Sequence, residues 1–180
     1  MKPLAKHPDG TRCGCADVAP RNDPRILVDL SAQRLSISGG SMPAASYVVS
    51  TAANGPGERS GSGCTPRGLH RVRVKIGAGC APGTVFRGRR WTGELYSDDL
   101  ARRCPDRDWV LTRILWLTGL ELGRNRAGDV DTLRRFIYIH GCPPCEPIGE
   151  PRSHGCIRMR DADLIALFDH TPVGTLVDIR

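Results

Sequence analysis

Short apolar runs separated by turn residues follow one another along most of this chain, and they limit what it can fold into. The runs lie at 25–30, 33–38, 45–51, 109–119, 134–141 and 176–180. Their length and their content of Val, Ile, Leu and Tyr predict β-strands. Residues 68–77, GLHRVRVKIG, alternate apolar and mainly basic side chains, which is typical of a strand with one face in water. The chain is therefore expected to be mainly β.

A helix is predicted near the C-terminus. Asp161 is a good N-cap residue, and Pro172 and Gly174 end the segment. Between them, apolar side chains recur at helical spacing at Leu164, Ile165, Leu167 and Phe168. Residues 77–108 are rich in Gly, Arg and Cys, and we expect an inserted loop region there. The expected architecture is mainly β with one late α-helix.

One domain over residues 25–180 is expected, because this length suffices for a hydrophobic core of its own. Residues 1–24 mix charge, Pro and Gly without apolar periodicity, which predicts an irregular N-terminal arm. No apolar segment of ~7–15 residues follows the first lysines, and no stretch reaches the ~18 apolar residues of a membrane span. We therefore expect a soluble chain with no signal peptide and no membrane span.

The charge balance favours anionic partners. The chain has 26 Lys and Arg against 19 Asp and Glu, a net charge of +7, which suits nucleic acid, lipid head groups or a carboxylate-rich substrate. Aromatic residues make up only 5% of the chain and do not interleave with basic ones, so a nucleic-acid surface is not expected. Three arginine clusters are interpreted as solvated surface, namely Arg87/Arg89/Arg90, Arg102/Arg103 and Arg134/Arg135, whereas Arg152, Arg158 and Arg160 flank a reactive segment.

That segment brings together several nitrogen and sulfur side chains, His140, Cys142, Cys145, His154 and Cys156. A closed zinc site needs four such ligands, so a non-catalytic zinc-binding module is one hypothesis. The spacing after the Cys pair fits no common zinc finger, and the chain has no second Cys-x-x-Cys. A thioredoxin-like site needs a helix after the pair, which Pro147, Gly149 and Pro151 disfavour. A small disulfide or inert loop thiols remain for Cys142 and Cys145.

Cys156 is the thiol best placed to act as a nucleophile. A nucleophilic cysteine needs a nearby base and donors for an oxyanion. The amides of Gly155 and Cys156 can supply such donors, whereas Cys142 is followed by two prolines that lack an N–H. Either His154 or His140 can be the base. His154 would share a face with Cys156 in an extended segment, and His140 would reach it from an adjacent strand, with the Gly141 carbonyl orienting its ring.

The segment SHGCIRM (153–159), with IYIHG (137–141) upstream, resembles the catalytic signature of the L,D-transpeptidases, the YkuD-type domain of peptidoglycan cross-linking. The segments 26–38, 48–72 and 171–179 also look like parts of that domain. The resemblance implies a β-sandwich-like fold and cysteine acyl transfer without a metal or other cofactor. It makes Cys156 the nucleophile, His140 the base and Gly141 the orienter, with His154 and Gly155 supporting the pocket and oxyanion hole. Ser153, Arg158 and Tyr138 are then the substrate-binding candidates.

The family further implies a tetrapeptide stem of peptidoglycan as donor. The enzyme would attack the carbonyl of its third residue, release the terminal D-Ala and pass the acyl group to an amine. Carbapenem-type β-lactams are expected as covalent inhibitors, and the periplasm or cell envelope as the location. An L,D-carboxypeptidase or amidase, with water on the same acyl-enzyme, is the alternative.

Overall fold

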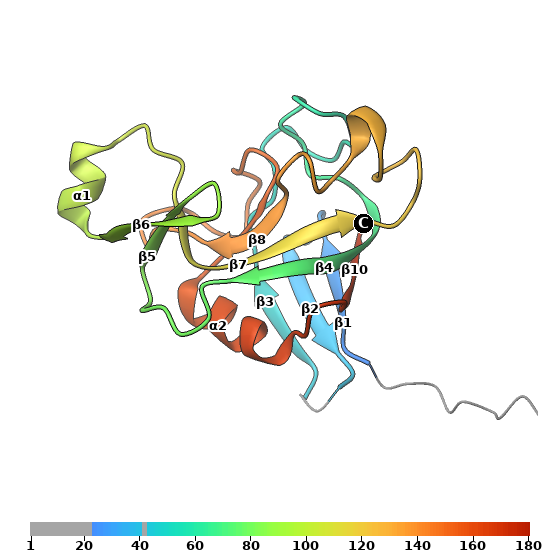
Figure 1. Ribbon diagram of the computed structural model, residues 1–180, viewed down its shortest axis with the longest axis horizontal. Helices are drawn as coiled ribbons and strands as arrows, with labels where there is room; N and C mark the ends of the chain where they lie inside the picture. Colours follow the sequence, from blue (N-terminus) through green and yellow to red (C-terminus); the bar gives the residue numbers. More distant parts are fainter. Residues whose placement is uncertain (1–22, 41–42) are drawn as a thin grey trace, which may run out of the picture.

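The computed structural model describes residues 23–40 and 43–180, so all but the last two residues of the predicted N-terminal arm lie outside the described residues. The described residues form one curled sheet with helices beside it (Figure 1). The elements are β1 (Arg25–Asp29), β2 (Arg34–Ser38), β3 (Ala45–Val48), β4 (Gly68–Ile76), β5 (Thr84–Arg87), β6 (Arg90–Leu95), α1 (Asp98–Arg103), β7 (Val110–Gly119), the 3-10 helix η1 (Gly128–Val130), β8 (Tyr138–Gly141), β9 (Ile157–Met159), α2 (Asp161–His170) and β10 (Leu176–Ile179). The predicted mainly β fold with a late helix is confirmed.

Strands β1, β2 and β3 form a meander, and residues next to the first turn stabilise it. The Oδ1 atom of Asp29 accepts hydrogen bonds from the amides of Ser31 and Ala32, each at 2.9 Å. Such a turn reverses the chain, so β1 and β2 pair antiparallel, and β3 pairs with β2. The C-terminal strand β10 lies between β1 and β4, parallel to the first and antiparallel to the second. The two ends of the domain thus share one sheet.

Strand β7 is the centre of the half of the sheet that carries the reactive segment. Leu111 pairs with Val85 of β5 and with Gly141 of β8, so β5 and β8 pair with opposite edges of β7. Further along, β4 pairs with β7 over Ile114–Gly119. Strand β8 in turn pairs with β9 in parallel. The two short segments that contain His140 and follow Cys156 are therefore neighbours.

The region 77–108 contains regular structure as well as the predicted loop. Strands β5 and β6 form a hairpin that projects with α1 from one side of the molecule (Figure 1). Helix α1 begins because the Ser97 side chain accepts a hydrogen bond from the Leu100 amide at 3.2 Å. Acidic residues in its first turn and basic ones in its last favour the helix dipole. This helix escaped prediction because it is only 6 residues long and buries no side chain.

Helix α2 packs its apolar stripe against the sheet. Leu164, Leu167 and Phe168 are buried in a cluster that also includes side chains from β1, β2, β4 and β7–β10. The predicted N-cap is wrong by one residue, since Arg160 has the extended backbone of the cap and Asp161 is already helical. The helix ends before Pro172, as predicted. Within residues 23–40 and 43–180, neither helix has the length and apolar character needed to cross a bilayer.

Candidate active site

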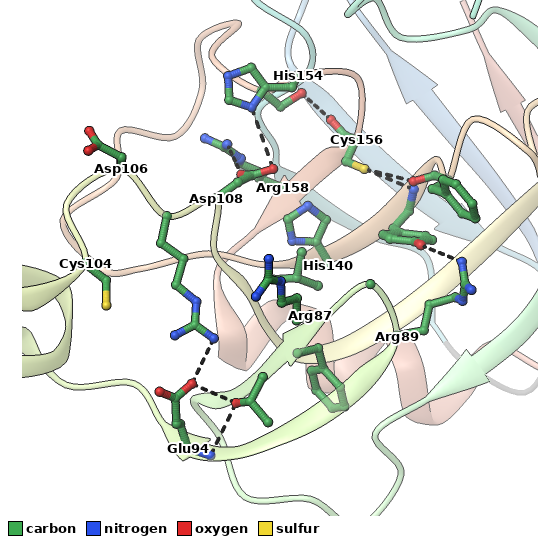
Figure 2. A pocket seen from close by; sticks show the side chains of 18 of the residues that line it. Arg87, Arg89, Glu94, Cys104, Asp106, Asp108, His140, His154, Cys156 and Arg158 are labelled. Carbon is green, nitrogen blue, oxygen red and sulfur yellow. Dashed lines mark hydrogen bonds and ion pairs between the residues drawn. The ribbon is translucent and has the colours of Figure 1, made fainter. Parts of the chain in front are cut away.

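The parallel pairing of β8 with β9 brings the predicted histidine and thiol to one place. His140 is opposite Arg158 in the register, and Cys156 directly precedes β9. The Tyr138 amide donates a hydrogen bond to the Cys156 sulfur at 3.3 Å, and the thiol donates to the Phe136 carbonyl at 3.4 Å. A cavity of about 1150 Å³ opens in front of them. Six of the eight predicted site residues line it, namely His140, Cys156, Tyr138, Ser153, His154 and Arg158. Figure 2 labels four of them, His140, His154, Cys156 and Arg158.

The His140 ring is held in one tautomer. Its Nδ1 atom lies 2.8 Å from the Gly141 carbonyl oxygen, and because a carbonyl only accepts, Nδ1 carries the proton. Nε2 is then the unprotonated nitrogen. Burial lowers the pKa of His140 to about 4, so the ring is neutral at pH 7. It has the protonation state of a general base.

Gly141 is required by close packing. A Cβ atom at this position would lie 2.7 Å from the Leu111 carbonyl oxygen and even closer to the Asp161 carboxylate. No side chain fits there without a shift of β7. The missing side chain thus lets β8 lie against β7, which positions the carbonyl that orients His140.

The Cys156 thiol is protonated. Burial raises the pKa of Cys156 to about 12, against a smaller lowering effect of the hydrogen bond from Tyr138. With a neutral imidazole and a neutral thiol, the two groups do not form a preformed ion pair. To act as a nucleophile, the sulfur would therefore have to lose its proton as it attacks, and a base would be needed at that step.

The turn that carries Cys156 is fixed by hydrogen bonds. Ser153 accepts from the Gly155 amide at 3.2 Å and donates to the Cys156 carbonyl at 2.5 Å. Thr65 donates to the Gly155 carbonyl at 3.0 Å. Gly155 has a φ of +132°, and a Cβ there would lie 3.2 Å from both Cys64 and Ile137. Only glycine adopts this backbone without strain, so the sequence Ser-His-Gly-Cys specifies the turn.

Two details of the sequence analysis are not realised. Residues 154–156 form a bend rather than an extended strand, so His154 and Cys156 do not share a strand face. The His154 side chain is 78% exposed, and its Nδ1 atom lies 3.7 Å from Asp108. The Gly155 amide is bonded to Ser153, so one of the two predicted oxyanion donors is already engaged.

Asp108 and Arg135 are cavity residues that the sequence did not reveal. Asp108, just before β7, accepts a hydrogen bond from the buried Arg158 at 2.9 Å. Arg135 donates to the carbonyls of Gly57 at 3.0 Å and Glu58 at 2.7 Å, and also to that of Cys64. The surface interpretation is therefore wrong for Arg135. Arg89 is half-buried and lines the cavity, whereas Arg87 lines it with an exposed side chain. No motif marks these residues, because long-range folding brings them there.

The other thiols have separate environments. Cys142 is buried, with its pKa raised to about 11 by burial, and donates to the Met159 carbonyl at 3.5 Å. Cys145 is exposed, 3.6 Å from the Tyr96 hydroxyl. All six cysteines among the described residues are free thiols. No group of three or more His, Cys, Asp or Glu in this part of the chain is arranged to hold a metal ion, so the zinc hypothesis gains no support.

Comparison with known proteins decides the family. The profile of the L,D-transpeptidase catalytic domain, YkuD, matches residues 23–179. The chain belongs to this family. A segment of 45 residues is 51% identical to the probable L,D-transpeptidase ErfK/SrfK of Salmonella typhimurium, over 25% of this chain and 15% of that protein. The predicted resemblance is thus confirmed.

Solved L,D-transpeptidases share the fold. The enzyme of Mycobacterium smegmatis superposes with a TM-score of 0.51 at 16% identity, over 88% of this chain and 58% of the other. An L,D-transpeptidase in complex with imipenem gives the same score and identity, over 88% and 59%. At such identity the likeness concerns the fold alone. This chain covers less than two thirds of the length of each of these proteins.

Proposed function

We propose that this chain is a peptidoglycan L,D-transpeptidase in which Cys156 forms an acyl-enzyme. The observation that supports this most is the pairing of β8 with β9, which places a neutral imidazole and a protonated thiol in the wall of one cavity. The carbonyl of Gly141 leaves Nε2 of His140 free to accept a proton. A fixed thiol with a base of the correct tautomer is what acyl transfer needs.

The steps follow from these positions. As the sulfur attacks the carbonyl carbon of the third stem residue, its proton passes to Nε2 of His140. The oxyanion that forms accepts from the Cys156 amide, since Ser153 already occupies that of Gly155. The imidazolium then protonates the amine of the leaving D-Ala, and the C–N bond breaks. An acceptor amine, deprotonated by His140, attacks the thioester and releases Cys156. No cofactor enters these steps.

The substrate-binding roles are assigned to Tyr138, Ser153 and Arg158. Arg158 is 7% exposed and forms ion pairs with Asp108 and Glu146. Its proposed role therefore includes holding the cavity wall in place as well as binding substrate. His154 and Gly155 support the turn of the nucleophile. Peptidoglycan stems are the proposed partners, and the cell envelope, where they occur, is the proposed location. Carbapenems are proposed inhibitors, since a related fold was solved with imipenem.

Mass spectrometry after incubation with a carbapenem tests the nucleophile. We expect one adduct, mapped to Cys156, that is lost in Cys156→Ala and retained in Cys142→Ala and Cys145→Ala. The two controls remove one buried and one exposed thiol from the same loop. An adduct on Cys142 in the wild-type protein would refute the assignment.

The acceptor is tested separately. With purified muropeptides we expect dimers formed by transfer to an amine. Tetrapeptides trimmed to tripeptides without dimers would instead indicate an L,D-carboxypeptidase that uses water, and release of an envelope protein from a stem would indicate an amidase. All three outcomes share the acyl-enzyme, so this experiment decides only between acceptors.

A further inference from the structure

Arg89 differs from the other arginines that line the cavity. Arg107 is paired with Glu94 at 2.8 Å, and Arg158 with Asp108 at 2.9 Å. Arg135 is occupied by backbone carbonyls. Among the residues that the structure describes, neither Arg87 nor Arg89 has a carboxylate partner. The Arg87 side chain is exposed, whereas Arg89 has a fixed position, which separates it from a freely moving surface arginine.

Aromatic side chains hold this guanidinium. Its central carbon lies 4.5 Å from the centre of the Trp116 ring and 4.8 Å from that of Phe136. Nη1 donates to the Tyr138 hydroxyl at 3.4 Å. Stacking on aromatic rings orients a guanidinium without neutralising its charge. In the described part of the chain, Nε and Nη2 make no hydrogen bond, so Arg89 keeps donors for a planar anion.

Two of these aromatic residues also contact the thiol through their backbones. The Phe136 carbonyl accepts a hydrogen bond from the thiol, and the Tyr138 amide donates one to the sulfur. The cation and the nucleophile are therefore linked through two shared neighbours, and Figure 2 shows both on the same side of the cavity. Arg89 has a φ of +148° and Phe136 a φ of +57°. In residues other than glycine these backbone conformations cost free energy, and they cluster at functional sites.

We propose that Arg89 binds a carboxylate of the donor peptide beside Cys156 and so makes a free acid group there a requirement for an efficient donor. This inference rests on the proposed function. A carboxylate is the anion that a guanidinium fork binds through two parallel hydrogen bonds. A stem offers two sources, its C-terminal carboxylate and a side-chain carboxylate. Arg89 sits on the β5–β6 hairpin, so the hairpin contributes to donor selection.

Binding to the inactive Cys156→Ala protein tests this without turnover. The ligands are a synthetic tetrapeptide stem, its C-terminal amide and its side-chain amide, titrated by calorimetry. We expect Arg89→Gln to weaken binding of the free acid by about 10- to 100-fold. It should leave binding of one amide unchanged, and that amide identifies the carboxylate. Arg89→Lys should recover part of the loss. The control is Arg90→Gln, an exposed arginine of the same turn that does not line the cavity.

Equal loss for the acid and both amides would overturn the inference, because Arg89 would then only dock the hairpin. The inference would also be overturned if none of the three peptides bound to the Cys156→Ala protein that keeps Arg89. Failure of the proposed function has a different signature. In that case the protein with Cys156 intact would show carboxylate-dependent binding but no turnover of the tetrapeptide. Arg89 would then bind a carboxylate in a protein that is not a transpeptidase.

Discussion

At the scale of single residues, the neutral pair of Cys156 and His140 has a consequence for pH dependence. The pKa of His140 is lowered to about 4 and that of Cys156 is raised to about 12. Because the base is neutral above its folded pKa, we expect the rate of acylation to stay level between about pH 5 and 8. Single-turnover acylation followed by mass spectrometry measures it. A rise centred near pH 6.5 would contradict the neutral pair.

Replacing His140, the proposed base, should slow acylation more than a change in its protonation state. His140→Gln keeps a polar side chain of similar length but removes the proton acceptor, so acylation should slow by about 100- to 10,000-fold. The pH profile of the residual rate should then rise with thiolate formation, toward high pH. His154→Gln is the control, since His154 is exposed and makes no contact with the sulfur. A greater loss in His154→Gln than in His140→Gln would reverse the two roles.

Thr65 is a second residue that fixes the proposed nucleophile, Cys156. Its buried hydroxyl donates to the Gly155 carbonyl and accepts from the Ala52 amide, each at 3.0 Å. Thr65→Val keeps the shape and leaves both groups unsatisfied, at a cost of about 2–4 kcal/mol. Chemical denaturation measures this, and acylation should slow as the turn loosens. Thr118→Val in β7 is the matched control, because Thr118 is half-buried and its hydroxyl makes no hydrogen bond to any residue that the structure describes. An equal effect of both variants would contradict the role of Thr65.

At the scale of elements, Lys75 connects the central sheet to α2. Its Nζ atom donates to the Phe168 carbonyl at 2.6 Å, near the C-terminus of the helix, and lies 4.2 Å from the Phe168 ring centre. A cation there stabilises the helix end. Lys75→Met should lower the free energy of unfolding by about 1–2 kcal/mol, measured by urea denaturation. Arg73→Met, an exposed position on the same strand, should change it little. A loss confined to Arg73→Met would contradict this account.

The elements also show what the sequence could and could not predict. Strands with clear alternation, such as β4, agree with their predicted limits within a residue. The run 134–141 yields a strand only from Tyr138, because Phe136 turns with a φ of +57° to meet Cys156 and Trp116. The Ser-His-Gly-Cys turn was marked by its own motif. No motif marks Arg89, Asp108 or Arg135. Their positions depend on pairing between strands that are distant in the sequence, and such pairing leaves no local sequence pattern.

At the scale of the whole molecule, two buried histidines control stability in mild acid. His70 and His140 are almost fully buried, and burial lowers the pKa of each to about 4. Below their ordinary pKa of 6.5 the unfolded chain binds protons that the folded chain does not, so stability falls as the pH drops toward 4. Each histidine contributes a loss of roughly 1 kcal/mol per pH unit in this window.

The loss of stability caused by the two histidines occurs at a higher pH than the loss caused by protonation of carboxylates. The carboxylates of Glu58, Glu94 and Glu121 have lowered pKa values because of their hydrogen bonds, so their contribution is lost only below their ordinary value of 4.5. Between pH 6.5 and 4.5 the two histidines dominate, and the melting temperature should fall by on the order of 10 °C. His70→Gln should be less stable at pH 7.5, because it disturbs the contacts to Gly68 and Thr132, yet show a shallower slope. Scanning calorimetry at both pH values measures this, and a slope in His70→Gln as steep as in the wild type would mean that His70 is not one of the groups that titrate on unfolding.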